Sequence, residues 1–306
     1  MDGIIPLWKE AGMTSHDCVF KLRKMLKMKK IGHSGTLDPA VNGVLPICIG
    51  KGTKVIEYLQ DSGKVYQGEV VLGVATTTED ATGEVVASAP VEETSVTEEM
   101  IDQVMNQFVG TITQIPPMYS AVKVKGKRLY EYARAGETVE RPKRQAVIKE
   151  FKRISPLSYH PETKTLSFQF IVACGKGTYV RTLAVDTGKT LGYPAHMSQL
   201  TRLESGGFKE QDSVTLEEIR TLVEMDTYSF VHPIEEGVKD LVQISLSDEQ
   251  YEDVRHGRFL SQEDLGLTET TELVAIFYHE LLVGIYGPHP KQAQMYKPVK
   301  IIRNYL

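Results

Sequence analysis

An aspartate in a conformationally restricted segment is the first candidate for chemistry in this sequence. Pro39 removes one amide donor and biases Asp38 toward an extended backbone, whereas Gly32, Gly35 and Gly43 permit close approach of the chain or a positive φ. The segment therefore holds a carboxylate on a constrained loop, and carboxylates serve enzymes as nucleophiles and as bases. An Asp-Pro pair that only forms a turn is the alternative interpretation.

A second cluster combines an aromatic ring with a guanidinium. Tyr179 and Arg181 stand at alternate positions, where a strand is expected to give way to a helix. Together they can offer a stacking face and a bidentate partner for a carboxylate. Taken alone, Arg181 fits an ordinary residue in the first turn of a helix.

Two segments concentrate positive charge. In residues 119–144, Lys and Arg are interleaved with tyrosines, which suits single-stranded or loop RNA because bases stack and phosphates need neutralising. In residues 21–30, six cations follow a helix start that holds a lone Asp17. A solvated hairpin and a solvated helix face are the alternatives, since most charge runs lie in solvent.

Several common catalytic motifs are absent. Gly50-Lys51-Gly52-Thr53 and Gly175-Lys176-Gly177-Thr178 lack the spacing of a phosphate-binding loop or of a dinucleotide fingerprint. The eight histidines include no H-E-x-x-H and no pair at metal-ligand spacing, and no G-x-S-x-G is present. We therefore predict no metal and no nucleotide cofactor.

The composition narrows the class of protein. At 306 residues and 34.2 kDa the chain is long enough for two domains, and its charge of −5 means that any basic surface is local. Three widely separated cysteines give neither a disulfide framework nor a zinc ribbon, which fits a reducing compartment. No stretch of eighteen apolar residues and no signal-peptide pattern is present, so a cytoplasmic protein is expected.

The periodicity of apolar residues predicts the elements that position these side chains. Thr14 with Asp17 and Thr215 with Glu218 form capping boxes ahead of helices. Further predicted elements are a strand at 65–72, a helix from 97 to 110, a strand at 166–173 and a helix at 181–191. Beyond a boundary near Gly237, a short helix at 247–255 and strands at 273–278, 282–286 and 297–302 indicate a small β-rich module.

Several ordered segments resemble one enzyme family. Gly32-His33-Ser34-Gly35-Thr36-Leu37-Asp38-Pro39 with Gly43-Val44-Leu45-Pro46 resembles the signature of the bacterial tRNA pseudouridine synthase B family, the tRNA pseudouridine-55 synthases. Further similar segments, in order, are 9–15, 65–66, 115–121, 177–181 and 200–202. The resemblance covers essentially the whole chain, and the tail around 257–258 and 296–300 resembles the small PUA-type RNA-binding module.

The resemblance implies a fold and a domain plan. The fold is the α/β (α+β) pseudouridine synthase fold, with a mixed, largely antiparallel sheet, flanking helices and a small β-rich, PUA-like C-terminal domain. The implied domains are a catalytic domain at 1–237, with an RNA-clamping insertion at about 123–152, and an RNA-binding domain at 238–306.

The resemblance also implies a cofactor-free reaction. Uridine 55 in the T loop of tRNA would be isomerised to pseudouridine after the base flips out, leaves its ribose, turns and is rejoined through C5. Asp38 would be the nucleophile, and attack at the anomeric carbon, attack at uracil C6 and a glycal route all stay open. An ionised carboxylate in a closed pocket needs a cation, which Arg181 would supply. Tyr66 would stack on the base and take part in deprotonating C5.

Substrate-binding positions follow from the same resemblance. His33 would fill the space that the flipped base leaves, Tyr179 and Leu200 would form pocket walls, and Lys9 would support the site. Stacking at about 1–3 kcal/mol per base can offset the few kcal/mol that unstacking a nucleotide costs. The implied partner is the T-arm of tRNA, and we expect a monomer with no membrane contact and no small-molecule cofactor.

Two other functions stay open from the sequence. A non-catalytic tRNA-binding or RNA-folding protein would need only the basic helix, the insertion and the tail module. A uridine-directed glycosidase would use the same nucleophile but let water finish the reaction, which would release free uracil.

Overall fold

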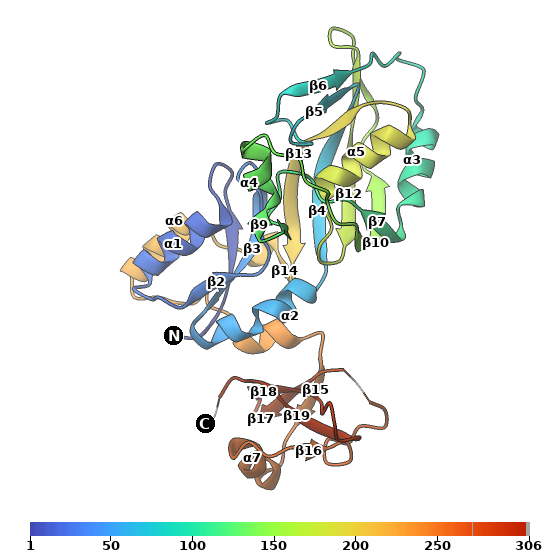
Figure 1. Ribbon diagram of the computed structural model, residues 1–306. Coiled ribbons are helices and arrows are strands. Elements are labelled where there is room, and N and C mark those ends of the chain that lie inside the picture. The colour runs from blue at the N-terminus through green and yellow to red at the C-terminus, as the bar shows by residue number, and fades with distance from the viewer. Residues whose placement is uncertain (271, 304–306) are drawn as a thin grey trace.

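The computed structural model describes residues 1–270 and 272–303, which form two main β-sheets and two short two-stranded sheets (Figure 1). The larger sheet uses strands between residues 3 and 209, and the smaller sheet uses strands between residues 242 and 301. Helices flank the larger sheet, so the expected α/β class is confirmed. No helix of the described residues is long and apolar enough to cross a membrane.

The larger sheet is mixed and largely antiparallel, as expected. All of its neighbours pair antiparallel except β3 and β13, which are parallel. The main path runs β1 (Gly3–Lys9), β3 (Asn42–Ile49), β13 (Ala195–Ser205), β4 (Lys64–Leu72), β12 (Thr165–Cys174), β10 (Arg144–Arg153) and β7 (Gly110–Gln114). Three short strands join its sides: β2 (Ile31–His33), β11 (Ser158–His160) and β14 (Phe208–Lys209).

The helices begin where capping residues permit. Both predicted capping boxes are formed, at the start of α1 (Ser15–Met25) and of α6 (Leu216–Glu224). In the first box the Thr14 side chain accepts from the Asp17 amide at 3.0 Å. Helices α3 (Glu98–Gln107) and α5 (Val180–Thr190), both predicted, pack against each other and against the larger sheet (Figure 1).

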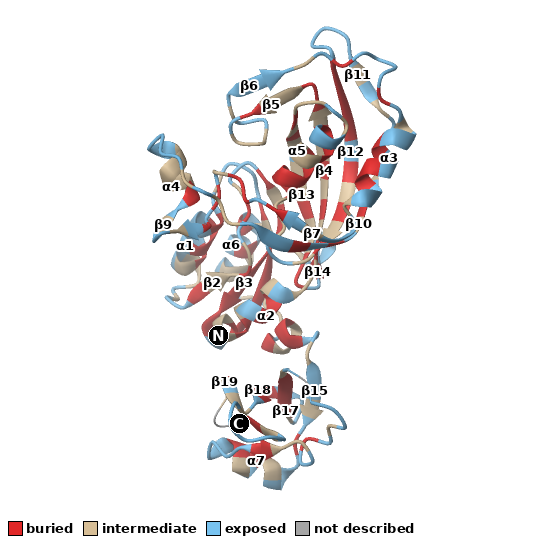
Figure 2. Ribbon diagram, turned by 45° about the vertical axis from the view of Figure 1, so that its right-hand side comes forward, coloured by how far each residue is buried: buried red, intermediate tan, exposed pale blue. Residues whose placement is uncertain are grey.

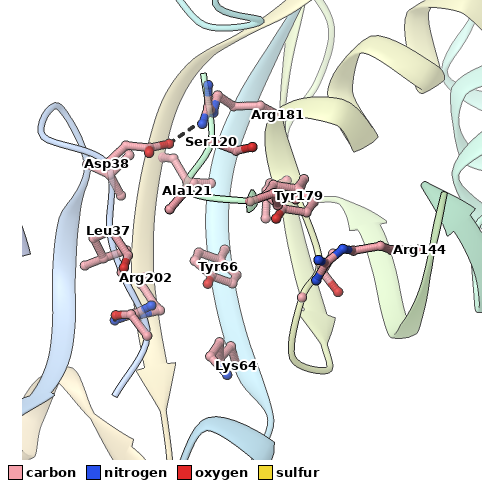
Figure 3. A pocket seen from close by; sticks show the side chains of 18 of the residues that line it. Leu37, Asp38, Lys64, Tyr66, Ser120, Ala121, Arg144, Tyr179, Arg181 and Arg202 are labelled. Atoms are coloured by element: carbon pink, nitrogen blue, oxygen red, sulfur yellow. Dashed lines mark hydrogen bonds and ion pairs between the residues drawn. The ribbon is translucent and has the colours of Figure 1, made fainter. Parts of the chain in front are cut away.

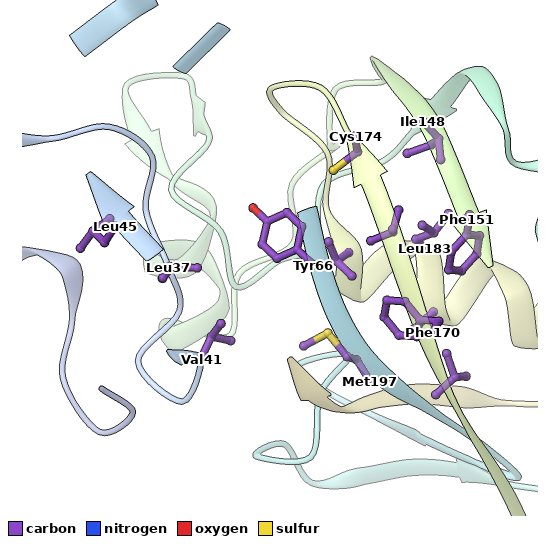
Figure 4. Close-up of a cluster of buried hydrophobic side chains, with 14 of the residues drawn as sticks. Leu37, Val41, Leu45, Tyr66, Ile148, Phe151, Phe170, Cys174, Leu183 and Met197 are labelled. Carbon is purple, nitrogen blue, oxygen red and sulfur yellow. The ribbon is translucent and has the colours of Figure 1, made fainter. Parts of the chain in front are cut away.

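Strand β4 shows how the core and a polar site come to share one face. Successive residues of a strand point to opposite faces, so Lys64 and Tyr66 lie on the same face as Val70 and Leu72. That face is buried (Figure 2), and it carries the main apolar cluster. Figure 4 shows Tyr66 at the edge of this cluster, with its hydroxyl pointing away from Phe170 and Met197.

Residues 115–143 leave the sheet between β7 and β10. They include the hairpin β8 (Lys123–Val124) and β9 (Lys127–Arg128), followed by α4 (Leu129–Arg134). The expected insertion at 123–152 was too long at its end, because 144–152 form most of β10 and pair with β7 and β12. Ala146 and Ile148 are buried there while Gln145 and Val147 are exposed, which is the alternation of a sheet strand.

The C-terminal module is the expected small β-rich unit. Its sheet has the order β15 (Val242–Ser245), β17 (Val274–Tyr278), β18 (Leu281–Pro288), β19 (Met295–Ile301) and β16 (Leu260–Ser261), with helix α7 (Asp248–Arg255). The predicted helix and strands are therefore present. Leu282 and Ile285 of the module pack in one cluster with Ile4 and Ile234. The remaining elements are β5 (Val74–Thr76), β6 (Val85–Ser88), α2 (Ile56–Asp61) and the 3-10 turns η1 (Gly50–Val55), η2 (Glu210–Asp212) and η3 (Ile234–Val238).

Candidate active site

A cavity of about 470 Å³ lies where β4, β13, the loop before β3, the 115–143 segment and the start of α5 meet (Figure 3). Five of the seven predicted site residues line it: Asp38, Tyr66, Tyr179, Arg181 and Leu200. They come from segments up to 162 positions apart, between 38 and 200. Only the folded sheet brings them together.

Asp38 and Arg181 form an ion pair at this cavity. Arg181 Nε lies 3.0 Å from Asp38 Oδ2, and the two side chains are 8% and 40% exposed. The other guanidinium nitrogens are also occupied, since Nη1 donates to Thr78 O and Nη2 donates to Tyr119 O, both at 2.9 Å. The guanidinium is therefore held in one orientation, with Nε left to meet the carboxylate.

The environment tunes the Asp38 carboxyl. Burial raises the pKa of Asp38 above its ordinary value, and Arg181 is the strongest influence in the opposite direction. Asp80 adds to the rise in pKa, and its Oδ2 lies 3.8 Å from Arg181 Nη1. A higher pKa makes the ionised carboxylate a stronger base and nucleophile.

The loop that carries Asp38 depends on two glycines. Gly35 and Gly43 adopt positive φ values of 89° and 125°, so the expected use of glycine is confirmed at both positions. A Cβ on Gly43 would lie 2.2 Å from the carbonyl oxygen of Arg202. Only glycine permits this close approach of the loop to β13.

Lys9 holds the same loop from beneath. Its side chain is fully buried, and Nζ donates to the carbonyl oxygens of Glu10 (3.0 Å), Pro39 (3.2 Å) and Val41 (2.6 Å). We grouped Lys9 with the substrate-binding residues and expected it to support the site. With its three ammonium hydrogens on carbonyls, Lys9 is placed to position the Asp38 loop.

His33 lies outside the lining of the cavity. It belongs to β2, two residues before Gly35, which does line the cavity. Its Nδ1 is buried without a hydrogen-bond partner in the described structure. Burial is the main reason that the pKa of His33 is below its ordinary value, so the imidazole is neutral at pH 7.

Two aromatic rings, those of Tyr66 and Tyr179, line the cavity. Burial raises the pKa of the Tyr66 hydroxyl, while the nearby Arg202 guanidinium, 6.0 Å from the ring centroid, opposes the rise. Tyr179 stands just before α5, and the side chain of Gln114 in β7 holds its backbone. The Tyr179 amide donates to Gln114 Oε1 at 3.0 Å, and Gln114 Nε2 donates to the Tyr179 carbonyl oxygen at 3.1 Å. Sequence reasoning missed Gln114, which has no motif of its own.

The sequence analysis also missed two buried cations of the cavity. Arg202 is fully buried, and it donates from Nε to Val44 O at 2.7 Å and from Nη2 to Gly35 O at 3.2 Å. Lys64 is 8% exposed, and Nζ donates to Gln60 O at 2.9 Å and to Ser62 O at 3.4 Å. The strand pattern could have found both cations. Lys64 stands two residues before Tyr66 on β4, and Arg202 stands two residues after Leu200 on β13, so each shares a face with a predicted site residue.

Lys123 and Arg144 mark the open side of the cavity. Both line it, both are exposed, and neither forms an ion pair within the described part of the chain. Ser120 lines the cavity beside them, and its buried Oγ has no hydrogen-bond partner in the described structure. These groups offer charge and hydrogen bonds that a bound molecule can use.

Known proteins share this chain's sequence over almost its full length. Two family models match it: "TruB family pseudouridylate synthase (N terminal domain)" over residues 23–180 and "tRNA pseudouridylate synthase B C-terminal domain" over residues 181–239. A tRNA pseudouridine synthase B of Streptococcus sanguinis (strain SK36) is 56% identical over 301 residues, covering 98% of this chain and 99% of that protein. The protein of the same name from Listeria welshimeri serovar 6b is 51% identical and covers 99% and 98%.

A solved structure shares the fold. A chain in the "Crystal Structure of a Cbf5-Nop10-Gar1 Complex" is 28% identical, with a TM-score of 0.74, and the match covers 98% of this chain and 85% of that one. The match therefore includes both sheets. With more than half of its residues identical to those of a full-length relative, this chain belongs to the TruB family of pseudouridylate synthases.

Proposed function

We propose that this protein is a tRNA pseudouridine synthase that isomerises uridine 55 of the T loop, using Asp38 as the nucleophile. The observation that carries the proposal is the Asp38–Arg181 ion pair at a cavity bounded by Tyr66, Tyr179 and Leu200. The names of the similar proteins, tRNA pseudouridine synthase B, support tRNA as the substrate.

The cavity residues divide the work by chemistry. Asp38 attacks, and Arg181 keeps it ionised and correctly oriented. Tyr66 stacks on the flipped base and takes part in removing the C5 proton, while Tyr179 and Leu200 form the walls. Stacking of about 1–3 kcal/mol per base is comparable to the cost of flipping a nucleotide.

Two residues outside the cavity complete the proposed site. His33 is neutral and lies on β2 close to the Asp38 loop in sequence, so it can fill the gap that the flipped base leaves without adding charge. Lys9 sets the position of the loop through three carbonyls. We assign it no contact with RNA.

RNA binding extends beyond the cavity. We assign catalysis to residues 1–237 and a further RNA contact to 238–306. The projecting 115–143 segment and Lys123 would clamp the T-arm, with Arg144 at the cavity mouth. The proposal describes a cytoplasmic monomer that needs no cofactor.

Tritium release tests the proposal. Wild-type protein should release tritium from C5-labelled uridine in an unmodified tRNA transcript without added metal or nucleotide. Asp38→Asn should lower the rate of release by a factor on the order of 10⁴, while the tRNA Kd stays within twofold. Free uracil as the product would indicate a glycosidase, and intact binding with no release by either protein would indicate an RNA-folding protein.

A further inference from the structure

The cavity contains two buried cations that have no carboxylate partner. Arg202 of β13 lies directly opposite Tyr66 of β4, and Lys64 is two residues from Tyr66 on the same face. Both cations line the cavity and donate hydrogen bonds to backbone carbonyls, and Arg202 also interacts with the Tyr66 hydroxyl. Neither forms an ion pair within the described chain.

No nearby acid can neutralise this pair. Asp38 is the one carboxylate that lines the cavity in the described structure, and it is engaged by Arg181 at 3.0 Å. Asp61 is the acid that acts on Lys64, and its Oδ1 lies 2.5 Å from the ammonium of Lys176 instead. The two buried positive charges therefore lie at one cavity without a carboxylate partner in the described structure.

Such an arrangement is unfavourable for the empty protein. Removing a charge from water costs free energy unless an opposite charge compensates, and a second like charge adds to the cost. The effect is visible in the pKa of Lys64, which burial and then Arg202 lower to about 8. Destabilised charges in a cavity mark functional sites, because a ligand or an intermediate brings the missing counter-charge.

The missing anion is supplied by the proposed reaction itself. A uridine base is neutral when it enters. In the C6 route it stays bonded to Asp38, but in the anomeric and glycal routes the N1–C1′ bond breaks with its electron pair left on the base. The charge is then shared among N1, O2 and O4 of the detached uracil. A phosphate is a less suitable match, since the exposed cations Lys123 and Arg144 stand at the open side of the cavity and Lys64 is buried.

We propose that Lys64 and Arg202 form the subsite that stabilises the detached uracil as an anion while it turns; this inference rests on the proposed function. Lys64 Nζ uses two hydrogens on Gln60 O and Ser62 O, which leaves one for a base oxygen. In the anomeric route the C1′–C5 bond then forms as the bond from Asp38 to C1′ breaks, the C5 proton leaves, and N1 gains a proton. Lys64 and Arg202 remain protonated throughout.

The charged and titratable groups around Lys64 allow its titration to be identified in a pH–rate profile. Arg202 faces it from β13, Cys174 from β12, Asp61 from α2 and Lys176 from the loop before α5. Burial raises the pKa of the Cys174 thiol, so it stays neutral at pH 8. Arg202, as a guanidinium, stays charged. Loss of activity with an apparent pKa near 8 would therefore report Lys64.

Single-turnover rates on a T-arm stem-loop provide the test, with binding measured separately. Lys64→Met should lower the rate of pseudouridine formation by about 10- to 100-fold, with the RNA Kd unchanged within twofold. Lys64→Arg should keep most of the rate. Lys149→Met is the matched control, because it removes an exposed lysine near Gly63 that neither lines the cavity nor acts on Lys64, and it should stay within twofold of wild type.

The pH profile separates an electrostatic role from a structural one. Above pH 8 the wild-type rate should fall, the Lys64→Met rate should stay flat, and Lys64→Arg should move the fall to higher pH because a guanidinium keeps its proton. If Lys64→Met does not fold, the pH at which the rate falls is compared between wild type and Lys64→Arg, and this comparison alone tests the inference.

Three results would overturn the inference. The first is a wild-type rate in Lys64→Met. The second is a decrease in rate above pH 8 that occurs at the same pH in Lys64→Arg as in wild type. The third is a Lys64→Met variant that binds RNA more weakly and with a shallower salt dependence, but reacts at the wild-type rate. The last would make Lys64 a phosphate contact. A wild-type protein that binds the stem-loop but forms no pseudouridine would refute the proposed function instead.

Discussion

The cavity and the C-terminal module use their cations in different ways. Five cations line the cavity, and only Arg181 among them is paired with an acid in the described structure. In the C-terminal module, Arg258 lies 2.5 Å from Asp253, Lys300 lies 3.1 Å from Glu57 and Arg303 lies 2.7 Å from Glu235. Over residues 238–306 there are 7 Lys and Arg against 10 Asp and Glu.

The difference concerns available charge. A cation that is anchored by carbonyl groups keeps its full charge for a ligand, whereas one in an ion pair has most of its field cancelled. The ion pairs of the module, which are exposed at Arg258 and mostly buried at Arg303, therefore reduce its attraction for phosphate. We therefore expect the cavity side of the molecule to dominate RNA affinity and its salt dependence.

We expect the largest effect from breaking the Asp38–Arg181 ion pair of the cavity. Arg181→Met removes the strongest influence that lowers the pKa of Asp38, so this pKa rises further. Because Asp38 must be ionised, the acid limb of the pH–rate profile should move to higher pH. The rate at pH 7 should fall by roughly 10²- to 10³-fold. Arg181→Lys should move the limb less, and an unmoved limb in both variants would contradict the assigned role.

An intermediate effect follows from removing the support of the Asp38 loop. Lys9→Met removes three hydrogen bonds to carbonyls, although Pro39 O still accepts from Gly12 N at 2.8 Å, so the unfolding free energy should fall by about 2 kcal/mol. Displacement of Asp38 should lower the single-turnover rate by roughly 10- to 100-fold. Urea unfolding and the tritium assay measure the two effects, and a rate loss without any loss of RNA affinity is expected. Lower affinity at an unchanged rate would restore Lys9 to the substrate-contacting set.

The smallest expected effect compares single cations of the two regions. Lys123→Gln and Arg144→Gln should each raise KM about fivefold at an unchanged kcat. Each should reduce the slope of log affinity against log salt by about 0.7–0.9. Arg258→Gln is the matched control from the module, where Asp253 already neutralises the charge, and its slope should equal that of wild type. Equal changes in all three variants would remove the distinction between the regions.

The sequence predicted the chemical groups of the site better than it predicted how they are arranged in space. The constrained Asp38 loop and the Tyr179–Arg181 cluster were visible as residue types, and the structure joins them in one ion pair at 3.0 Å. The strand at 65–72 and the capping boxes also follow from local patterns, and each was found. Such features depend on neighbours in the chain, so their signals lie within a few residues.

Other features could not be predicted because they depend on contacts between distant segments. Residues 144–152 looked like part of a charged insertion, yet pairing with β7 and β12 makes them a strand of the main sheet. Lys9 matched a motif near the substrate, yet packing under the 39–41 segment turned it inward. The burial of Lys64 and Arg202 was likewise invisible, since lysine and arginine are usually exposed.

Sequence alone determined which groups can react and which short segments become helices or strands, because bond rotation, capping and periodicity are local properties. The tertiary structure alone decided which charges meet. Asp38 obtains a cation because α5 starts beside the 32–46 loop, while Lys64 and Arg202 are both buried at one cavity because β4 and β13 are neighbours. Electrostatic free energy depends on distance and on exclusion of water, and both are properties of the folded chain.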